Sequence, residues 1–353
     1  MPRSKHFCES LLSWYPAAAR ELPWRKTADP YKIWISEVML QQTTVKAVIP
    51  YYKKWVKAFP NVQAVARAPR QKILKVWQGL GYYQRAKNIH RSAKIITRRF
   101  AGKIPQDPAR LSGLPGFGPY TTGAVLSIAF DHPHPIIDAN IRRVVMRLLC
   151  LKGPADRKHE AKIYDFLSRV FPKDRGGQFN QALMELGALV CRNHEPICNL
   201  CPVKKYCRAF FDGVQEIIPS PRRKVIESIS AVVALIRKNG AYFIQKRGAQ
   251  GLLADLWEFP GGKIERGESA REALQREIKE ELKVEIKSAH HIMVVVHYYT
   301  RFKVTLNVWR CHVARAPRVD KLHKWVPLGR LPDYPMPSGS TKIVNALMQG
   351  KAG

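Results

Sequence analysis

Hydrophobic residues recur every three to four positions across residues 29–206, and short segments with Gly or Pro separate the repeats. The clearest repeats lie at residues 38–55, 73–80 and 183–190. This spacing puts the apolar side chains on one face of a helix. Almost no strict alternation of apolar and polar residues occurs before residue 225. The pattern therefore predicts an all-helical N-terminal part.

The pattern changes after a segment rich in Pro, Ser and charge, residues 217–228, which we interpret as a linker. Strand-like runs then lie at residues 229–237, 241–247, 292–299 and 302–313. They surround one acidic helical stretch, and the helical segment 341–349 follows them. We therefore expect a multidomain protein, in which an all-α part precedes an α+β domain.

Composition adds a prediction about partners. The 353-residue chain carries 60 Lys and Arg against 27 Asp and Glu, a formal net charge of +33. An excess of this size favours binding to a phosphate backbone, with a basic protein of no specific target as the alternative. No apolar run is long enough to span a membrane, and residues 1–20 do not resemble a signal peptide.

Four of the seven cysteines are clustered. Cys191, Cys198, Cys201 and Cys207 have the spacing C-x6-C-x2-C-x5-C, and thiolates suit zinc or iron–sulfur centres. Structural zinc sites usually show paired C-x2-C units, and only one is present here. The spacing therefore favours one 4Fe-4S cluster, with four unligated cysteines as the alternative.

A glycine hairpin precedes an apolar stretch at residues 111–130. Its Leu-Pro-Gly-x-Gly sequence places Gly116 and Gly118 immediately before a helix N-terminus. Glycines let a backbone approach a ligand closely, and free amides at a helix start attract phosphate. Taken by itself, however, the glycine hairpin fits an ordinary turn between two helices better.

The hairpin and the cysteine spacing together resemble the helix-hairpin-helix superfamily of DNA glycosylases that carry a four-iron cluster. Within it, "LPWR", "PYKIWISEVMLQQT", "GLGYY" and "IIDANIRRV" are similar to the MutY adenine glycosylases. The similarity covers roughly residues 5–215. It implies a six-helix barrel with the hairpin over residues 29–134, and a helical iron–sulfur domain from residues 1–28 and 135–216. It also implies a cytoplasmic, nucleoid-associated protein.

Two acidic residues of the helical part lie in apolar surroundings. Glu37 has Ile33, Trp34 and Leu40 as helical neighbours, which would raise its pKa and suit a general acid. Asp138 opens a helix, where an ionised carboxylate can stabilise an oxocarbenium-like sugar. A half-buried helix acid and an N-cap are the structural alternatives.

The resemblance assigns roles to these acids. It implies that Glu37 protonates the departing adenine and that Asp138 stabilises the sugar cation, with Asn140 bonding within the site and Tyr120 supporting the intermediate. Glycosylases with lyase activity carry a lysine nucleophile at the Tyr120 position, and tyrosine cannot form a Schiff base. We therefore expect hydrolysis of the base alone, which leaves an abasic site.

An enzyme that acts on a base in a duplex must flip the base out of the stack. By resemblance, Trp24, Arg25, Leu40 and Glu185 line the adenine pocket. Gln42 and Tyr82 would fill or wedge the stack beside the vacated position. Trp24 and Tyr82 also fit a second interpretation, as aromatic residues of the core.

The acidic stretch after Gly262 follows the pattern G-x5-E-x7-R-E-U-x-E-E, where U is aliphatic. Its acids are Glu268, Glu277, Glu280 and Glu281. Carboxylates gathered in this way suit Mg or Mn, and the pattern resembles the Nudix box of pyrophosphohydrolases. Lys283 departs from it, because the box ends in Gly. The resemblance predicts a Nudix-like domain over residues 229–349.

Two interpretations of this domain remain open. In the first, the Nudix box is catalytic and the domain hydrolyses an oxidised nucleotide. In the second, the box is an inherited scaffold and the domain recognises 8-oxoguanine. We favour the second, because the domain is fused to a DNA-binding enzyme. Tyr299 and Thr300 can stack on and bond to the lesion, whereas Arg301 is unlike the family's His.

The sequence thus predicts a monomeric repair enzyme that removes adenine mispaired with 8-oxoguanine or guanine in double-stranded DNA. The alternatives are an endonuclease III-like pyrimidine glycosylase, a nucleotide pyrophosphohydrolase and a non-catalytic lesion sensor.

Overall fold

The computed structural model describes residues 2–221, 226–251, 253–299 and 302–351. The chain forms two compact units. The first unit combines residues 1–67 with 88–223, and the second combines residues 68–87 with 224–353. The second unit therefore includes a segment that the sequence assigned to the helical part.

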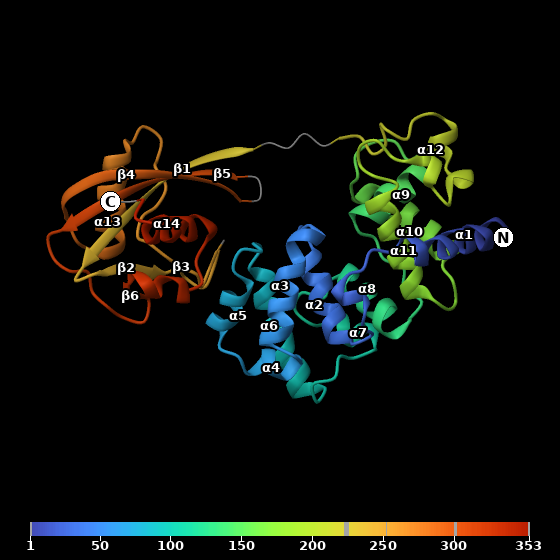
Figure 1. The fold of residues 1–353 in the computed structure, drawn as a ribbon, viewed down its shortest axis with the longest axis horizontal. Coiled ribbons are helices and arrows are strands. Elements are labelled where there is room, and N and C mark those ends of the chain that lie inside the picture. The colour runs from blue at the N-terminus through green and yellow to red at the C-terminus, as the bar shows by residue number, and fades with distance from the viewer. Residues whose placement is uncertain (1, 222–225, 252, 300–301, 352–353) are drawn as a thin grey trace. The chain divides into compact units, whose positions relative to one another are not determined.

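The first unit is built from helices, shown from blue to yellow-green in Figure 1. Its α-helices are α1 (Pro2–Ala18), α2 (Pro30–Leu40), α3 (Val45–Ala58), α4 (Val62–Arg67), α7 (Pro108–Ser112), α8 (Pro119–Phe130), α9 (Ala139–Leu148), α10 (Glu160–Val170), α11 (Gly176–Leu189) and α12 (Arg208–Phe211). Its 3-10 segments are η1 (Pro23–Arg25), η2 (Arg157–His159), η3 (Cys198–Leu200) and η4 (Lys204–Tyr206). Helix α6 (Gln84–Arg99) starts in the second unit and ends in the first.

Short polar side chains start several of these helices. Asp29 accepts a hydrogen bond from the Tyr31 amide at 2.9 Å, with Pro30 as the first residue of α2. Asp107 accepts from the Arg110 amide at 2.8 Å and starts α7. Such caps satisfy amides that lack a partner within the helix.

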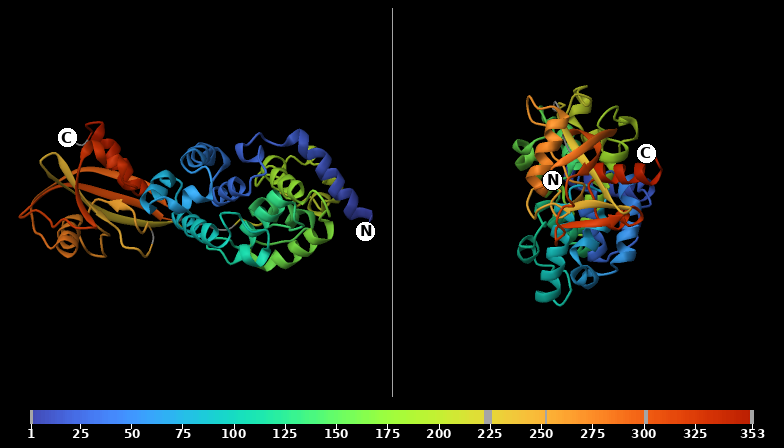
Figure 2. Two further views of the ribbon diagram at one scale, coloured as in Figure 1. Left: turned by 90° about the horizontal axis from the view of Figure 1, so that it is seen from below. Right: turned by 90° about the vertical axis from the view of Figure 1, so that its left-hand side faces the viewer.

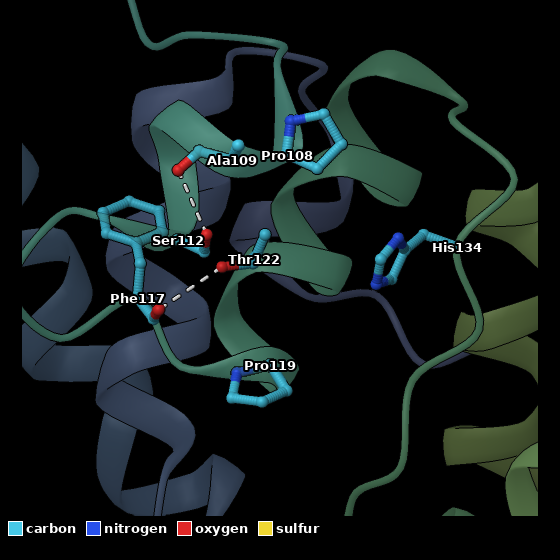
Figure 3. A pocket seen from close by; sticks show the side chains of 7 residues that line it. All are labelled: Pro108, Ala109, Ser112, Phe117, Pro119, Thr122 and His134. Carbon is cyan, nitrogen blue, oxygen red and sulfur yellow. Dashed lines mark hydrogen bonds between the residues drawn. The ribbon is translucent and has the colours of Figure 1, made fainter.

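The glycine hairpin joins α7 to α8. Gly116 has a φ of +84°, and a Cβ there would lie 2.8 Å from the Asn88 Cβ, so only glycine fits this turn. Figure 3 shows two hydrogen bonds beside the hairpin. The Ser112 hydroxyl donates to the Ala109 carbonyl at 3.1 Å, and the Thr122 hydroxyl donates to the Phe117 carbonyl at 3.4 Å. These side chains line a shallow hollow of about 500 Å³.

A large core joins α1, α8, α9, α10 and α11. Its members are buried apolar residues from each helix, among them Leu11, Ala124, Val145, Ile163 and Leu183. Most of helix α11 lies in this core, because nine of its residues are buried. Such burial on several sides holds α8, α9 and α11 in fixed positions relative to one another.

The second unit contains a six-stranded sheet, α5 (Arg70–Trp77) and further helices. Its other elements are β1 (Glu227–Lys238), β2 (Ala241–Lys246), β3 (Trp257–Glu258), α13 (Ala270–Leu282), β4 (Ile286–Tyr299), β5 (Phe302–Val313), β6 (His323–Pro327), η5 (Leu328–Asp333) and α14 (Ser338–Met348). The strand order is β3-β2-β1-β5-β4, and β6 pairs with β2.

Strand β1 determines how the helices cover this sheet. Alternate residues Val232, Ala234 and Ile236 pack with α13, whereas Val233 and Leu235 pack in the core that includes α14. The two helices therefore lie on opposite faces (Figure 1, Figure 2). Strand β1 pairs with β5 in parallel over ten positions, and β4 pairs with β5 as an antiparallel neighbour.

The predicted fold class is confirmed. Helices occupy the N-terminal part, and the four strand-like runs correspond to β1, β2, β4 and β5. Residues 41–44 divide the first predicted helical region into α2 and α3. The last two residues of the expected linker already belong to β1, and the sequence did not indicate the short strands β3 and β6. The finer domain boundaries stay predictions.

Candidate active site

A cleft of about 910 Å³ opens in the first unit. Nine residues selected from the sequence line it: Trp24, Arg25, Glu37, Leu40, Gln42, Tyr120, Asp138, Asn140 and Glu185. They come from η1, α2 and the turn that follows it, α8, α9 with its N-cap, and α11. The packing of these helices thus brings together residues that lie up to 161 positions apart.

Glu37 lies on the buried face of α2 and is 4% exposed. Its Oε2 accepts a hydrogen bond from the Tyr120 hydroxyl at 2.5 Å. Burial raises the pKa of Glu37 to about 7, although the bond from Tyr120 opposes the shift, and the charge of Asp138 adds to it. A carboxyl group with this pKa holds a proton near neutral pH and can donate it.

Asp138 is the N-cap of α9, one of the two alternatives from the sequence, and its side chain also reaches the cleft. Its Oδ1 accepts from the Ile141 amide at 2.6 Å and caps α9, and its Oδ2 accepts from Asn140 Nδ2 at 3.0 Å. Burial raises the pKa of Asp138, while these hydrogen bonds and the charge of Arg143 oppose the shift. The carboxylate caps a helix and also lines the cleft.

The wall contributed by α11 is fixed by a buried ion-pair network. Glu185 is fully buried, and its two oxygens pair with Arg20 and Arg25. A buried carboxylate needs such partners, because an unpaired charge there is costly. Trp24, beside them, is 6% exposed and packs edge-on against Tyr52 at 5.3 Å. Trp24 is therefore a core residue that also lines the cleft.

Several residues that line or support the cleft were missed. Gln181 and Met184 lie on the face of α11 that carries Glu185, and Met184 Sδ is 3.8 Å from the Tyr120 hydroxyl. Helical spacing from Glu185 would have indicated Gln181, four residues earlier, but not the adjacent Met184. Arg20 and Gln41 also line the cleft, and Gln41 Nε2 donates to Thr121 at 3.0 Å. No local pattern marks these two.

The four clustered cysteines lie near one another beside α9. Arg147, 1% exposed, donates to Cys191 Sγ at 3.3 Å, and the Cys207 thiol donates to the Arg147 carbonyl at 3.5 Å. Burial raises the pKa of Cys201 to about 12, and the charges of the other three cysteines add to the shift. In the described ranges, no three ligand side chains lie close enough to hold a single metal ion. A 4Fe-4S cluster, which is larger than one ion, binds thiolates that stand further apart.

The other described residues that the sequence selected are not among those that line the cleft. Gly116 and Gly118 form the hairpin. Tyr82 has a φ of +47° and is 38% exposed, and the Arg85 guanidinium lies 5.4 Å from the centre of its ring. Tyr299 ends β4, and its backbone pairs with Phe302. Thr300 and Arg301 lie outside the described residues.

The four acids of the Nudix-like pattern, Glu268 before α13 and three on it, are held in two places. Arg276 pairs with Glu268 at 2.8 Å, Glu277 at 3.0 Å and Glu280 at 3.4 Å. Glu281 accepts instead from Gln245 at 2.7 Å and from the Gly261 amide at 3.1 Å. Within the described ranges, the four acids therefore do not converge on one point.

Two positions next to α13, Gly262 and Lys283, show where the Nudix-like pattern needs glycine and where it does without it. A Cβ at Gly262 would lie 2.1 Å from Glu277 Oε1, so the glycine makes room for the carboxylate. Lys283, where the box has Gly, ends α13 with a left-handed φ of +57°. Glycine adopts that conformation freely, and a lysine pays about 1 kcal/mol for it.

The two parts of the chain match two known families. The HhH-GPD superfamily of base excision DNA repair proteins matches residues 35–169, and the NUDIX domain matches residues 231–346. A solved thermostable thymine-DNA glycosylase is 27% identical, with a TM-score of 0.53 over 60% of this chain and 98% of that chain. An endonuclease III–DNA covalent intermediate, 23% identical with a TM-score of 0.50, has the same fold over 58% of this chain and 94% of that one. The chain thus combines a part similar to base excision DNA repair proteins with a part similar to the NUDIX domain.

Relatives that extend across both parts narrow this class. An adenine DNA glycosylase from Buchnera aphidicola subsp. Acyrthosiphon pisum is 34% identical over 304 residues, which cover 85% of each chain. The human adenine DNA glycosylase is 32% identical over 362 residues, or 86% of this chain and 66% of that protein. The chain belongs to the adenine DNA glycosylase family, whose members are DNA repair enzymes. No helix in the described ranges is long and apolar enough to cross a membrane.

Proposed function

We propose that this glycosylase removes adenine mispaired with 8-oxoguanine or guanine in double-stranded DNA and leaves an abasic site. The observation that carries the proposal is the pair of carboxyl groups, buried Glu37 and partly exposed Asp138, in one cleft with Tyr120. The pKa of Glu37, raised to about 7, supports it as the general acid.

The reaction divides between the two acids. Glu37 gives its proton to a ring nitrogen of adenine as the N-glycosidic bond breaks, and the bonding electrons leave with the base. The negative charge of Asp138, with Asn140 bonded to it, stabilises the positive charge on the sugar. Water then adds to the sugar carbon and loses a proton to the Glu37 carboxylate, so the products are free adenine and an abasic site and the acid is restored.

Other residues of the cleft fit recognition of a flipped base. Trp24 and Leu40 offer apolar contact, while Arg25 and Glu185 form a buried polar edge. We assign Gln42, which has a φ of +58°, to the space that the base vacates. Outside the cleft, we assign Tyr82 to wedging the stack and the Gly116–Gly118 hairpin to binding a phosphate.

Single-turnover assays on matched duplexes test this function. We expect rapid adenine release from A:8-oxoguanine and slower release from A:G, with none from A:T. Release of an oxidised pyrimidine instead would favour the endonuclease III-like alternative, and mismatch binding without base release would favour a lesion sensor.

The lack of a lysine at position 120 supports a monofunctional enzyme. The Tyr120 hydroxyl donates to Glu37 and carries no amine for a Schiff base. We expect no strand nicking until alkali is added, and no covalent complex after borohydride reduction. Tyr120→Lys tests the position, because nicking by this variant would show that an amine there reaches the sugar.

We propose that Cys191, Cys198, Cys201 and Cys207 hold one 4Fe-4S cluster. Their closeness around α9, their partial burial and their all-sulfur chemistry support this assignment. The cluster would cross-link the chain that follows α11, beside the basic residues Lys204 and Lys205. Iron and sulfide analysis should give four of each per chain. Cys198→Ala should lower both, whereas Cys150→Ala should not.

We propose that the C-terminal domain reads the 8-oxoguanine and that α13 serves it as a scaffold. The pairing of Arg276 with three of the box acids supports a structural role for this helix. Tyr299→Ala and Thr300→Ala test the assignment of lesion reading. Each should lower excision opposite 8-oxoguanine more than opposite guanine.

The complete set of acids favours a second candidate activity, Mg- or Mn-dependent hydrolysis of an oxidised nucleoside triphosphate. Glu268, Glu277, Glu280 and Glu281 would hold the cation in that case. Pyrophosphate release that needs the metal and is abolished by Glu280→Gln would establish it. No release from 8-oxo-dGTP with either metal would exclude it.

We further propose that the enzyme acts as a monomer, because one chain supplies every residue of the cleft. In a bacterial cell it would act in the cytoplasm, on the nucleoid DNA. Light scattering of the free and DNA-bound protein tests the oligomeric state, and a mass of two chains would contradict it.

A further inference from the structure

Helix α5 and the turn after it belong to the compact unit that contains the C-terminal domain. Ile73, Leu74 and Trp77 of α5 are fully buried. The turn that follows, residues 78–83, carries Tyr82. Tyr82, which we assign to wedging the DNA stack, is therefore in the same compact unit as the domain that we assign to lesion reading.

A buried carboxylate holds this segment. Asp255, 6% exposed, pairs with Lys87 at 2.9 Å, Arg70 at 3.3 Å and Lys246 at 3.7 Å. Two of these cations come from residues 68–87 and one comes from β2. Asp255 also has a left-handed φ of +68°, a conformation that costs free energy in a non-glycine residue. Burial and strain at one residue point to a role beyond packing.

Directional hydrogen bonds add to the ion pairs. The Gln71 amide donates to the Asp255 carbonyl at 3.0 Å and accepts from Trp257 Nε1 at 3.0 Å. Further along, Gln78 Nε2 donates to Thr341 Oγ1 at 2.8 Å. Both ends of α5 are thus bonded to the C-terminal domain, which fixes its position along the helix axis as well as its distance.

The turn is anchored through its backbone and its neighbours. Trp77 Nε1 donates to the Gly81 carbonyl at 3.0 Å, and the Tyr83 hydroxyl donates to the Met336 carbonyl at 3.4 Å. Between these anchors, Tyr82 has a φ of +47° and an exposed ring. The main chain is held while the aromatic side chain stays accessible.

We propose that the C-terminal domain sets the position of Tyr82 and that Asp255 is the positioning residue that holds α5 for this purpose. The inference rests on the wedging role proposed for Tyr82. It adds a second task for the C-terminal domain, distinct from reading 8-oxoguanine. Loss of Asp255 should therefore slow excision opposite guanine and opposite 8-oxoguanine alike.

A double-mutant cycle on the full-length enzyme tests the inference. Single-turnover excision is measured for Asp255→Asn, Tyr82→Ala and the double variant, on A:8-oxoguanine and A:G duplexes. Asp333→Asn is the matched control, because Asp333 is an exposed acid of the same domain that pairs with Arg330. We expect Asp255→Asn to lose about tenfold on both duplexes, with no further loss in the Tyr82→Ala background.

The outcomes separate this inference from the proposed function. If the two losses multiply, or if Asp255→Asn matches the control, Asp255 does not act through Tyr82 and the inference is wrong. If Tyr82→Ala alone leaves excision unchanged, the wedging role fails and the inference fails with it.

A milder variant covers the case in which Asp255→Asn does not fold. Thr341→Val keeps the side-chain shape and removes the hydroxyl that accepts from Gln78. We expect a loss of about threefold that also disappears in the Tyr82→Ala background. A loss that persists there would overturn the inference.

Discussion

Carboxylates gather in the cleft of the helical unit and on α13 of the C-terminal domain, and the two groups have opposite surroundings. In the cleft, Glu37 is buried and its hydrogen-bond partner is a neutral tyrosine. In the C-terminal domain, Glu268 from the turn before α13 and Glu277 and Glu280 on α13 surround one arginine. Burial raises the pKa of Glu37, whereas hydrogen bonding to Arg276 lowers the pKa of Glu268. The same side-chain type thus stores a proton in one place and keeps a fixed charge in the other.

The substitution Glu37→Gln gives the largest expected effect. Glutamine keeps the shape and cannot donate an acidic proton, so adenine excision should fall by about 10³-fold while DNA binding persists. Single-turnover base release measures the excision rate, and a binding assay on the same duplex measures the affinity for DNA. Glu280→Gln is the matched control on α13 and should change excision by less than about twofold. Full excision by Glu37→Gln would contradict the mechanism.

Asp138→Asn separates the two roles of one carboxylate. Asparagine caps helices as well as aspartate does, so the melting temperature should change little. Excision should fall by about 10²-fold, because the negative charge beside the sugar is lost. A large drop in melting temperature with a near-normal rate would mean that Asp138 acts only as the cap of α9.

The pH dependence sharpens the comparison further. The protonated form of Glu37 is the active one, so excision should fall as pH rises through about 7, the raised pKa of this group. The Tyr120 hydroxyl lowers that pKa, so Tyr120→Phe should move the fall to higher pH. Single-turnover rates across this range measure both. A rate that rises through neutral pH would show that Glu37 acts as a base.

The smallest effect is expected on α13. Arg276→Met removes the partner of three carboxylates, so the melting temperature should fall slightly and recover partly when Mg is added. Excision of adenine should change by less than about twofold, since surface substitutions rarely have larger effects. A tenfold loss of excision would show that the acidic helix takes part in the glycosylase reaction.

Sequence reasoning predicted the composition of the cleft better than its contacts. The apolar neighbours of Glu37 along one helix indicated its burial, because those positions follow from helical geometry alone. Which groups neutralise an acid depends on tertiary packing. The sequence therefore did not show that Glu185 pairs with Arg20, or that Glu281 turns away from the other acids toward Gln245.

The alternatives considered for Asp138 and Trp24 teach a related point. The sequence offered a structural and a functional role for each residue, and the structure places both residues in structural positions that also line the cleft. A carboxylate has two oxygens and an indole has two faces, so a structural role does not exclude a functional role for the same side chain. The position of α5 could not be predicted, because Gln71 and Gln78 bond it to the C-terminal domain and a helical pattern does not specify the partners of polar residues.

The division of the chain has a consequence for how such enzymes can be rebuilt. The backbone passes between the two units at residues 67–68, 87–88 and 223–224, and the second passage falls inside helix α6. A C-terminal domain joined by one linker could be exchanged between proteins as a cassette. The C-terminal domain of this protein is hydrogen-bonded to α5 of the preceding helical part. If this domain were fused to another glycosylase, we therefore expect it to function only when α5 is transferred with it.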